Sequence, residues 1–125
     1  MAANSGENFK IHGLTAAASL TAKQYHAVML ATTARQVKAA SAATVAIVGI
    51  LQNDPAAGEP ASVVGAGMTK AYSGAAIAAG DLVTANTTAQ LVATTTANNK
   101  VIGRAITAAS GTAVLFEVFV APSNY

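Results

Sequence analysis

The chain has 125 residues, of which seven are basic and five acidic, giving a formal net charge of +2, and it contains no cysteine. This length fits one compact domain, and the composition excludes disulfides, thiolate metal sites and a cysteine nucleophile. The charged residues are scattered singly, so no basic cluster follows a phosphate backbone and we expect no direct binding to nucleic acid.

The apolar part of the composition indicates a thin core. Alanine makes up nearly half of the 53 % hydrophobic content, and Val, Ile, Leu and Met together occupy only 28 positions. Alanine buries little apolar surface per residue. A small core combined with a weakly charged surface favours stabilisation by contacts between subunits, so we expect a homo-oligomer.

The first residues of the chain predict an N-terminal arm. Residues 2–8 are small, polar and unpatterned, which is typical of a flexible segment, and they lack the basic and apolar regions of a secretory signal, so we expect a protein made in the cytoplasm. Phe9, Ile11 and Leu14 follow as a short extended segment suited to strand addition on a partner. The alternative is a frayed terminus that leads into an ordinary first strand. The expected organisation is an arm, residues 1–14, and a single β-rich domain, residues 15–125.

Residues 15–43 allow either helix or strand. Their Ala-rich composition and the spacing of their apolar residues suit a helix. The strand interpretation uses Tyr25–Ala31, with Val37 in a later strand. We prefer strands because Leu20–Tyr25 aligns weakly with Ile77–Leu82, where a Gly-Asp turn between strands is clear.

The remainder of the chain predicts short strands. Thr44–Leu51 is a β-branched run that ends at the breaker cluster QNDPAAGEP, and it is typical of a strand buried on both faces. Further strands are expected at Ser62–Met68, Leu82–Ala85, Gln90–Thr94, Val101–Ile106 and Val114–Val120. Short strands at this spacing predict a mainly all-β fold, either a small β-barrel or a β-sandwich.

The residues capable of catalysis or metal binding are too dispersed to predict a site. His12 lies in the expected arm, where a rigid site is not expected, His26 has no acidic residue nearby in the sequence, and no metal-binding spacing occurs. Asp54 and Glu59 share a loop and could form a hydrolytic pair, but the simpler interpretation is that Asp54 caps a turn and Glu59 faces solvent. No apolar run is long enough to span a bilayer. We therefore expect no enzyme, no metal, no cofactor and no membrane association.

The C-terminal strand carries the most informative side-chain pattern, because alternate residues of VLFEVFV form two different faces. One face is apolar throughout and is expected to point to the core: Val114, Phe116, Val118 and Val120. The other places two large apolar side chains around a charge and is a candidate subunit interface: Leu115, Glu117 and Phe119. A sheet face covered by a loop explains the second pattern equally well.

Three stretches after residue 44 carry a family resemblance. They are VGILQNDPAAGEPASVV (Val48–Val64), GAAIAAGDLV (Gly74–Val83), and VIGRAITAAS with VLFEV (Val101–Val118). Together they resemble the small capsid decoration, or head cement, proteins of tailed bacteriophages. The first forty residues depart from the family pattern, since Lys23-Gln24 stands where a Gly-Asp turn is expected.

The resemblance implies a β-barrel or β-sandwich, no catalysis, and many copies on the outer surface of the DNA-filled capsid, commonly as trimers. The implied partner is the major capsid protein, whose neighbouring subunits would be bridged and the shell thereby stabilised. Phe9, Ile11 and Leu14 are the candidate capsid-binding residues. The alternative function is a tail or host-surface binding, adhesin-like module. That module would need an exposed aromatic or polar pocket, and the scattered Phe and Tyr residues argue against a sugar-binding platform.

Overall fold

The computed structural model describes residues 8–124, and within this range the chain is built from ten β-strands without a helix. The strands are β1 (Asn8–Ile11), β2 (Thr15–Ala16), β3 (Ala27–Leu30), β4 (Gln36–Ala39), β5 (Ile47–Leu51), β6 (Val63–Gly74), β7 (Leu82–Ala85), β8 (Leu91–Ala93), β9 (Lys100–Ala105) and β10 (Thr112–Asn124). The all-β prediction is confirmed. Residues 8–124 contain no helix able to cross a membrane.

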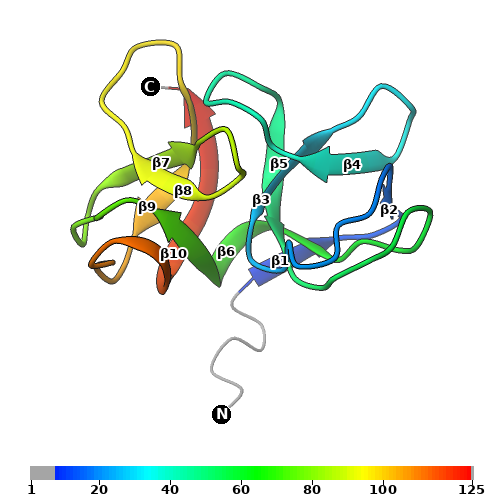
Figure 1. Ribbon diagram of the computed structural model, residues 1–125. Coiled ribbons are helices and arrows are strands. Elements are labelled where there is room, and N and C mark those ends of the chain that lie inside the picture. The colour runs from blue at the N-terminus through cyan, green and yellow to red at the C-terminus, as the bar shows by residue number, and fades with distance from the viewer. Residues whose placement is uncertain (1–7, 125) are drawn as a thin grey trace.

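Five strands close into a small barrel. β6 pairs with β10, β10 with β9, β9 with β7 and β7 with β8, and β8 returns to β6 through a parallel pairing at Ser73 and Leu91. β7 to β10 gather on the left of Figure 1. Closure leaves no unpaired edge running along these strands, which is how small all-β domains avoid edge-to-edge association. Of the two predicted architectures, the barrel is the one that forms.

The strands before β6 form a second unit, here called the N-terminal layer (β1–β5). The sheet continues from the first residues of β6 through β5, β3, β4 and β2, and β1 pairs separately with β6. In Figure 1 these strands lie on the right and β1 lies below them. β6 therefore belongs to both units, because its beginning joins the N-terminal layer and its end joins the barrel.

Neighbouring residues on the shared strands point into two different cores. Ile50 and Val64 pack in the barrel core, whereas Leu51 and Val63 pack in a smaller second core with Leu20 and other residues of the N-terminal layer. Since successive side chains of a strand face opposite sides, the sheet of β5 and β6 separates the two cores. The prediction that Thr44–Leu51 is buried on both faces is confirmed at Ile50 and Leu51.

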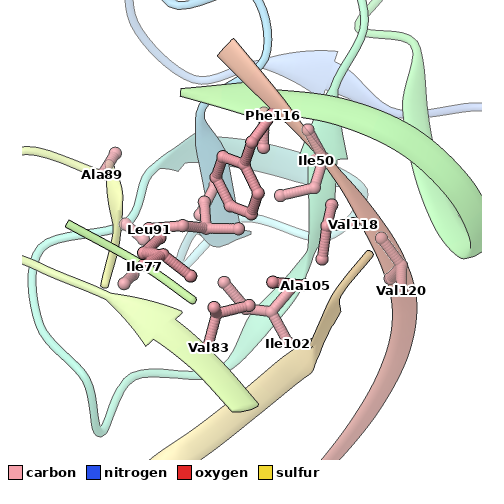
Figure 2. Packing of buried hydrophobic residues seen from close by; sticks show 14 of the residues in the cluster. Ile50, Ile77, Val83, Ala89, Leu91, Ile102, Ala105, Phe116, Val118 and Val120 are labelled. Carbon is pink, nitrogen blue, oxygen red and sulfur yellow. The ribbon is translucent and has the colours of Figure 1, made fainter. Parts of the chain in front are cut away.

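The barrel core is filled by a few large side chains among many alanines. Figure 2 shows the Phe116 ring pointing inward among Ile50, Leu91 and Val118. Val120 continues the same inward row of β10, and it is fully buried. The inward face of the C-terminal strand was predicted from its alternation and is confirmed.

β6 changes partners by means of an irregularity near Gly67. Val64 and Ala71 are an odd number of residues apart, yet both contribute to the barrel core, so the alternation shifts by one between them. The β1–β6 register shifts in the same region, between Phe9 and Lys10, and Gly67 has a φ of 101°, which glycine adopts readily. This offset lets one continuous strand serve two cores.

The strand interpretation of residues 15–43 is confirmed and the helix interpretation is wrong. β3 lies within Tyr25–Ala31, and Val37 lies in β4. Ala27 and Val28 are both completely buried but in different cores, which is the period-two arrangement of a strand between two layers. Pairing with β4 and β5 therefore overrides the helical propensity of the alanines.

The described part of the expected arm packs on the domain. β1 runs antiparallel to Val63–Gly67 of β6, and Leu14 is buried in the second core. Residues 8–14 are therefore strand and core of the domain rather than a separate segment, because their apolar alternation finds a partner on the edge of β6. Residues 1–7, which hold nearly all of the segment expected to be flexible, lie outside the described residues.

Candidate binding surface

The outward row of β10 places two large apolar side chains in solvent. Leu115 and Phe119 are 42 % and 46 % exposed, and Glu117 stands between them. The intervening residues Phe116 and Val118 are buried in the barrel. The predicted division of β10 into an inward and an outward face is confirmed, and the use of the outward face as a subunit interface stays a prediction.

Flanking strands extend this row into a broader surface. On β6, Met68 and Lys70 stand opposite Phe119 and Glu117, and on β9 Arg104 stands opposite Phe119. Ile106 follows β9, is 44 % exposed, and donates its backbone N–H to the carbonyl oxygen of Glu117. We call this surface the barrel face, and its residues are Met68, Lys70, Arg104, Ile106, Leu115, Glu117 and Phe119.

The barrel face combines exposed apolar side chains with charges of both signs. A hollow of about 390 Å³ lies beside Phe119 and is lined also by Arg104, Ile106 and Ala121. Arg104 Nη1 donates to the carbonyl oxygen of Gly80 at 2.7 Å, which fixes its side chain across the barrel surface. An apolar centre with charged neighbours, held on strands of a closed barrel, has the composition of a preformed protein interface.

The three residues predicted from the N-terminal segment lie in different environments. Phe9 is 76 % exposed, the highest value among the large apolar side chains of residues 8–124. Ile11 is half-buried against the second core and lies beside Gly65, while Leu14 is buried within that core. Phe9 stands opposite Ala66 of β6, two positions from Met68 of the barrel face. Of the three, only Phe9 has a side chain that lies mostly in solvent.

A second feature, here called the polar hollow, was missed by sequence reasoning. It has a volume of about 420 Å³ and is lined by Ala22, Gln24, His26, Asp54, Tyr72, Gln90 and Ala113. The Tyr72 ring lies 5.4 Å from the His26 ring and 6.5 Å from the Tyr25 ring, measured between centroids. These residues come from five separate segments, so no local sequence signal could have grouped them. The sequence showed the aromatic residues as scattered, and the fold brings two of the three tyrosines together.

Two carboxylates of the loop between β5 and β6 accept hydrogen bonds from backbone. Asp54 Oδ1 accepts the N–H of Gln24 at 2.9 Å, and Glu59 Oε1 accepts the N–H of Ala56 at 2.8 Å. Asp54 thus ties its loop to the turn before β3, and Glu59 closes a turn within its own loop. His12 is exposed. Within residues 8–124, no group of three or more His, Cys, Asp or Glu residues is placed to hold a metal ion.

His26 is the titratable group whose pKa is most clearly changed by its environment. Burial lowers the pKa of His26 below its ordinary value of 6.5, and the charge of Lys23 acts in the same direction, while a backbone hydrogen bond with Lys23 acts against it. The backbone contact with Gln24 and the charge of Asp54 oppose this shift. His26 is therefore favoured in its neutral form at neutral pH.

The sequence matches the family model of the phage cement protein over residues 21–121. The chain belongs to the phage cement protein family. The resemblance inferred from the sequence is confirmed, and with it the assignment as a capsid-associated structural protein located on the outer surface of the virion. A solved phage structure has a similar fold.

The crystal structure of the base of the head fiber gp8.5 of bacteriophage phi29 is similar to this chain with a TM-score of 0.65 and 18 % sequence identity. The similarity covers 91 % of this chain and 92 % of that one. At this level of identity the comparison shows a shared fold. No curated protein matches the sequence.

The region matched by the cement family contains most of the surface features described above. It runs from the turn before β3 into β10, so it includes the whole barrel face and every residue that lines the polar hollow. It leaves out β1 and β2, and with them Phe9, Ile11 and Leu14. The cement family match therefore covers the barrel and its surfaces, whereas Phe9 lies on a segment outside the match.

Proposed function

We propose that this cement protein binds the major capsid protein on the assembled shell as a homo-oligomer, with a trimer favoured, and stabilises the shell by bridging neighbouring capsid subunits. The barrel face carries this proposal. It groups Leu115, Phe119 and Ile106 on one exposed surface, and grouped apolar side chains of this kind are typical of a protein contact. The family match supplies the capsid as the setting.

The barrel face is proposed to join copies of the chain. Its apolar centre adds hydrophobic burial that the alanine-rich monomer core lacks. Lys70 and Glu117 stand opposite each other on β6 and β10, so the face carries charges of both signs, and a second copy could place its Glu117 against Lys70 or Arg104.

Phe9 is proposed to contact the capsid. Ile11 and Leu14 anchor the segment that carries it, since both pack against the second core. A single exposed aromatic residue gives a weak contact, but an oligomer presents several copies at once, and linked weak contacts combine through their effective concentration. Because such an oligomer binds only the assembled shell, it stabilises that state by mass action.

We also propose that the protein has no catalytic role. The support is chemical: Asp54 and Glu59 accept backbone N–H groups, and His26 lies within hydrogen-bonding distance of the carbonyl oxygen of Gln24. A nucleophile with an oriented base is not formed by these contacts.

The subunit proposal is tested with the double variant Leu115→Ser/Phe119→Ser. Both side chains are exposed, so we expect the melting temperature of the barrel to stay nearly unchanged while the oligomer, measured by light scattering, dissociates. Leu30→Ser is the matched control, because Leu30 is 48 % exposed but lies on β3 in the N-terminal layer. An oligomer that survives the double variant, or a wild-type protein that is monomeric both in solution and on shells, would contradict the proposal.

The capsid contact is tested with Phe9→Ser. We expect a folded oligomer whose co-sedimentation with undecorated shells falls about tenfold or more, because each copy loses one contact and multivalency amplifies the loss. The shells should also lose the added heat resistance that the wild-type protein confers. Unchanged shell occupancy with Phe9→Ser would remove Phe9 from the capsid interface.

A further inference from the structure

The polar hollow lies where the turn before β3 docks against the end of the barrel. Tyr72 of β6 donates its backbone N–H to the carbonyl oxygen of Tyr25 at 3.0 Å, and Ala27 donates to Ala89 at 2.8 Å. These bonds tie the turn to the barrel on both sides of the hollow. A volume of about 420 Å³ falls within the range of about 300–1,000 Å³ seen for small-ligand sites.

The hollow presents an aromatic surface beside polar groups. Tyr72 is half-buried, and its ring is tilted by 41° to the His26 ring at a centroid distance of 5.4 Å. Tyrosine offers an apolar ring face together with a hydroxyl group, so it can pack against a ligand that is itself apolar on one side and polar at its edge.

Several hydrogen-bonding atoms around the hollow remain available. His26 Nδ1 lies 3.1 Å from the carbonyl oxygen of Gln24, and since a carbonyl only accepts, the neutral ring keeps Nε2 as an acceptor. Asp54 uses Oδ1 on the N–H of Gln24, and Gln90 uses Oε1 on the Thr88 hydroxyl. Among residues 8–124 no hydrogen bond engages Asp54 Oδ2, Gln90 Nε2 or the Tyr72 hydroxyl.

The backbone around the hollow is held in an uncommon conformation. Ala22 and Ala113 line it with φ values of 65° and 61°, and Tyr25 and Ala89, next to lining residues, both have 65°. Non-glycine residues occupy the left-handed region rarely and at an energetic cost. Four such residues at one hollow are consistent with a shape that is maintained for binding.

The charges around the hollow restrict the class of ligand. Asp54 is the one carboxylate among its lining residues and disfavours an anion there, although the charge of nearby Lys23 partly offsets it. A metal ion would need more ligands than one free carboxylate oxygen and one imidazole nitrogen supply. A neutral ligand with several hydroxyl groups can donate to Asp54 and His26, accept from Gln90, and place its less polar face on Tyr72.

We propose that the polar hollow binds one ring of a neutral sugar, packed on Tyr72 and hydrogen-bonded by His26, Asp54 and Gln90. This activity is separate from capsid binding, because the hollow shares no residue with the barrel face or with Phe9. The protein would then carry sugar-binding sites on the outside of the virion, one for each copy.

The test is a titration of the ¹⁵N-labelled wild-type protein, followed by NMR, with methyl glycosides of glucose, galactose, mannose and N-acetylglucosamine. Concentrations up to roughly 50 mM exceed the millimolar Kd of a weak single-ring site. For at least one glycoside we expect saturable shifts confined to the amides of Gln24, His26 and Gln90 and their neighbours. Glucuronic acid, which carries the charge that Asp54 repels, should bind more weakly than the neutral sugar.

Variants make the assignment specific. Gln90→Ala and Asp54→Asn each remove one hydrogen-bonding group and should weaken binding about threefold to tenfold, and Tyr72→Leu should weaken it more. Gln36→Ala on β4 is the matched control and should bind like the wild type. The proposal is overturned if none of the glycosides shifts the amides around the hollow, if shifts occur only elsewhere, or if Gln90→Ala and Asp54→Asn bind like Gln36→Ala.

Discussion

The barrel and the N-terminal layer are made from similar short strands but reach stability by different routes. The barrel closes on itself through five strands and buries Phe116, Leu91 and Ile102 in one interior. The N-terminal layer stays open and ends at β2, a strand of two residues that pairs in parallel with β4. A closed sheet satisfies its own backbone, whereas an open one depends on what it packs against.

This difference indicates that the N-terminal layer depends on the barrel for its stability more than the barrel depends on the layer. β5 and the start of β6 form the wall between the cores, with Ile50 and Val64 on one side and Leu51 and Val63 on the other. The second core is built against this wall, whereas the barrel strands β7–β10 lie outside the wall and the barrel core takes only Ala27, Ala40 and Ile50 as buried residues from before β6. We therefore expect damage to the barrel to unfold the whole chain and damage to the layer to remain more local.

The largest effect is expected from Phe116→Ala. Phe116 is 3 % exposed at the centre of the barrel, so its truncation should lower the free energy of unfolding by about 3–5 kcal/mol. Urea denaturation measures this value. Hydrogen exchange should accelerate in both units together, and a variant that keeps protection in β3–β5 while losing it in the barrel would reverse the proposed dependence.

A smaller and more local effect is expected from Leu20→Ala. Leu20 is 2 % exposed in the second core, and its truncation should cost about 2–4 kcal/mol. Hydrogen exchange should accelerate mainly in β2–β4, while the amides of β7, β9 and β10 stay protected. Equal loss of protection in both units would show that the chain unfolds as a single cooperative unit. The expectation that damage to the layer stays local would then be wrong.

The sequence predicted the barrel better than the layer for a physical reason. Barrel strands such as Leu82–Ala85 lie between Gly, Asn and Asp turn signals, and β7 has the predicted bounds. In the layer, β3 and β4 are short and follow alanine-rich segments, so local propensity favoured a helix as much as a strand. Pairing with β5 decides the outcome there, and pairing partners distant in the chain cannot be read from composition.

The two candidate binding surfaces also differ in how far the sequence could predict them. Leu115, Glu117 and Phe119 share one face because of simple alternation, so the outward row of β10 was predictable from a single strand. The polar hollow was not, since Tyr72 and His26 meet only through the docking of the turn before β3. The burial of Leu14 matches the alternative of an ordinary first strand, which the sequence could not decide because Val63 and Leu51 of the same core belong to strands far along the chain.

The wall between the two units is tested by Gly49→Ala. A Cβ atom at Gly49 would collide with the carbonyl oxygen of Val64, where β5 meets β6. To avoid this collision β5 and β6 must separate locally, which should lower the free energy of unfolding by about 1–3 kcal/mol. Gly111→Ala is the matched control, since nothing lies within 4 Å of its Cβ position. If Gly49→Ala were as stable as Gly111→Ala, the contact between β5 and β6 would not be the tight wall described here.

The smallest expected effect is a pH dependence at His26, in the turn that joins the layer to the barrel. Burial lowers its pKa in the folded chain below the ordinary value of 6.5, so the unfolded chain binds a proton more readily than the folded one. The contribution of His26 to stability is therefore complete above pH 6.5 and is lost as the pH falls through that value toward the lower folded pKa. The charge of Lys23 strengthens this effect, while the backbone contacts with Gln24 and Lys23 and the charge of Asp54 weaken it. We expect the melting temperature of the wild type to fall slightly more than that of His26→Gln between pH 7.5 and pH 5, values chosen about one unit or more either side of the ordinary pKa. If the melting temperatures of the two proteins changed with pH by the same amount, the folded chain would not disfavour protonation of His26.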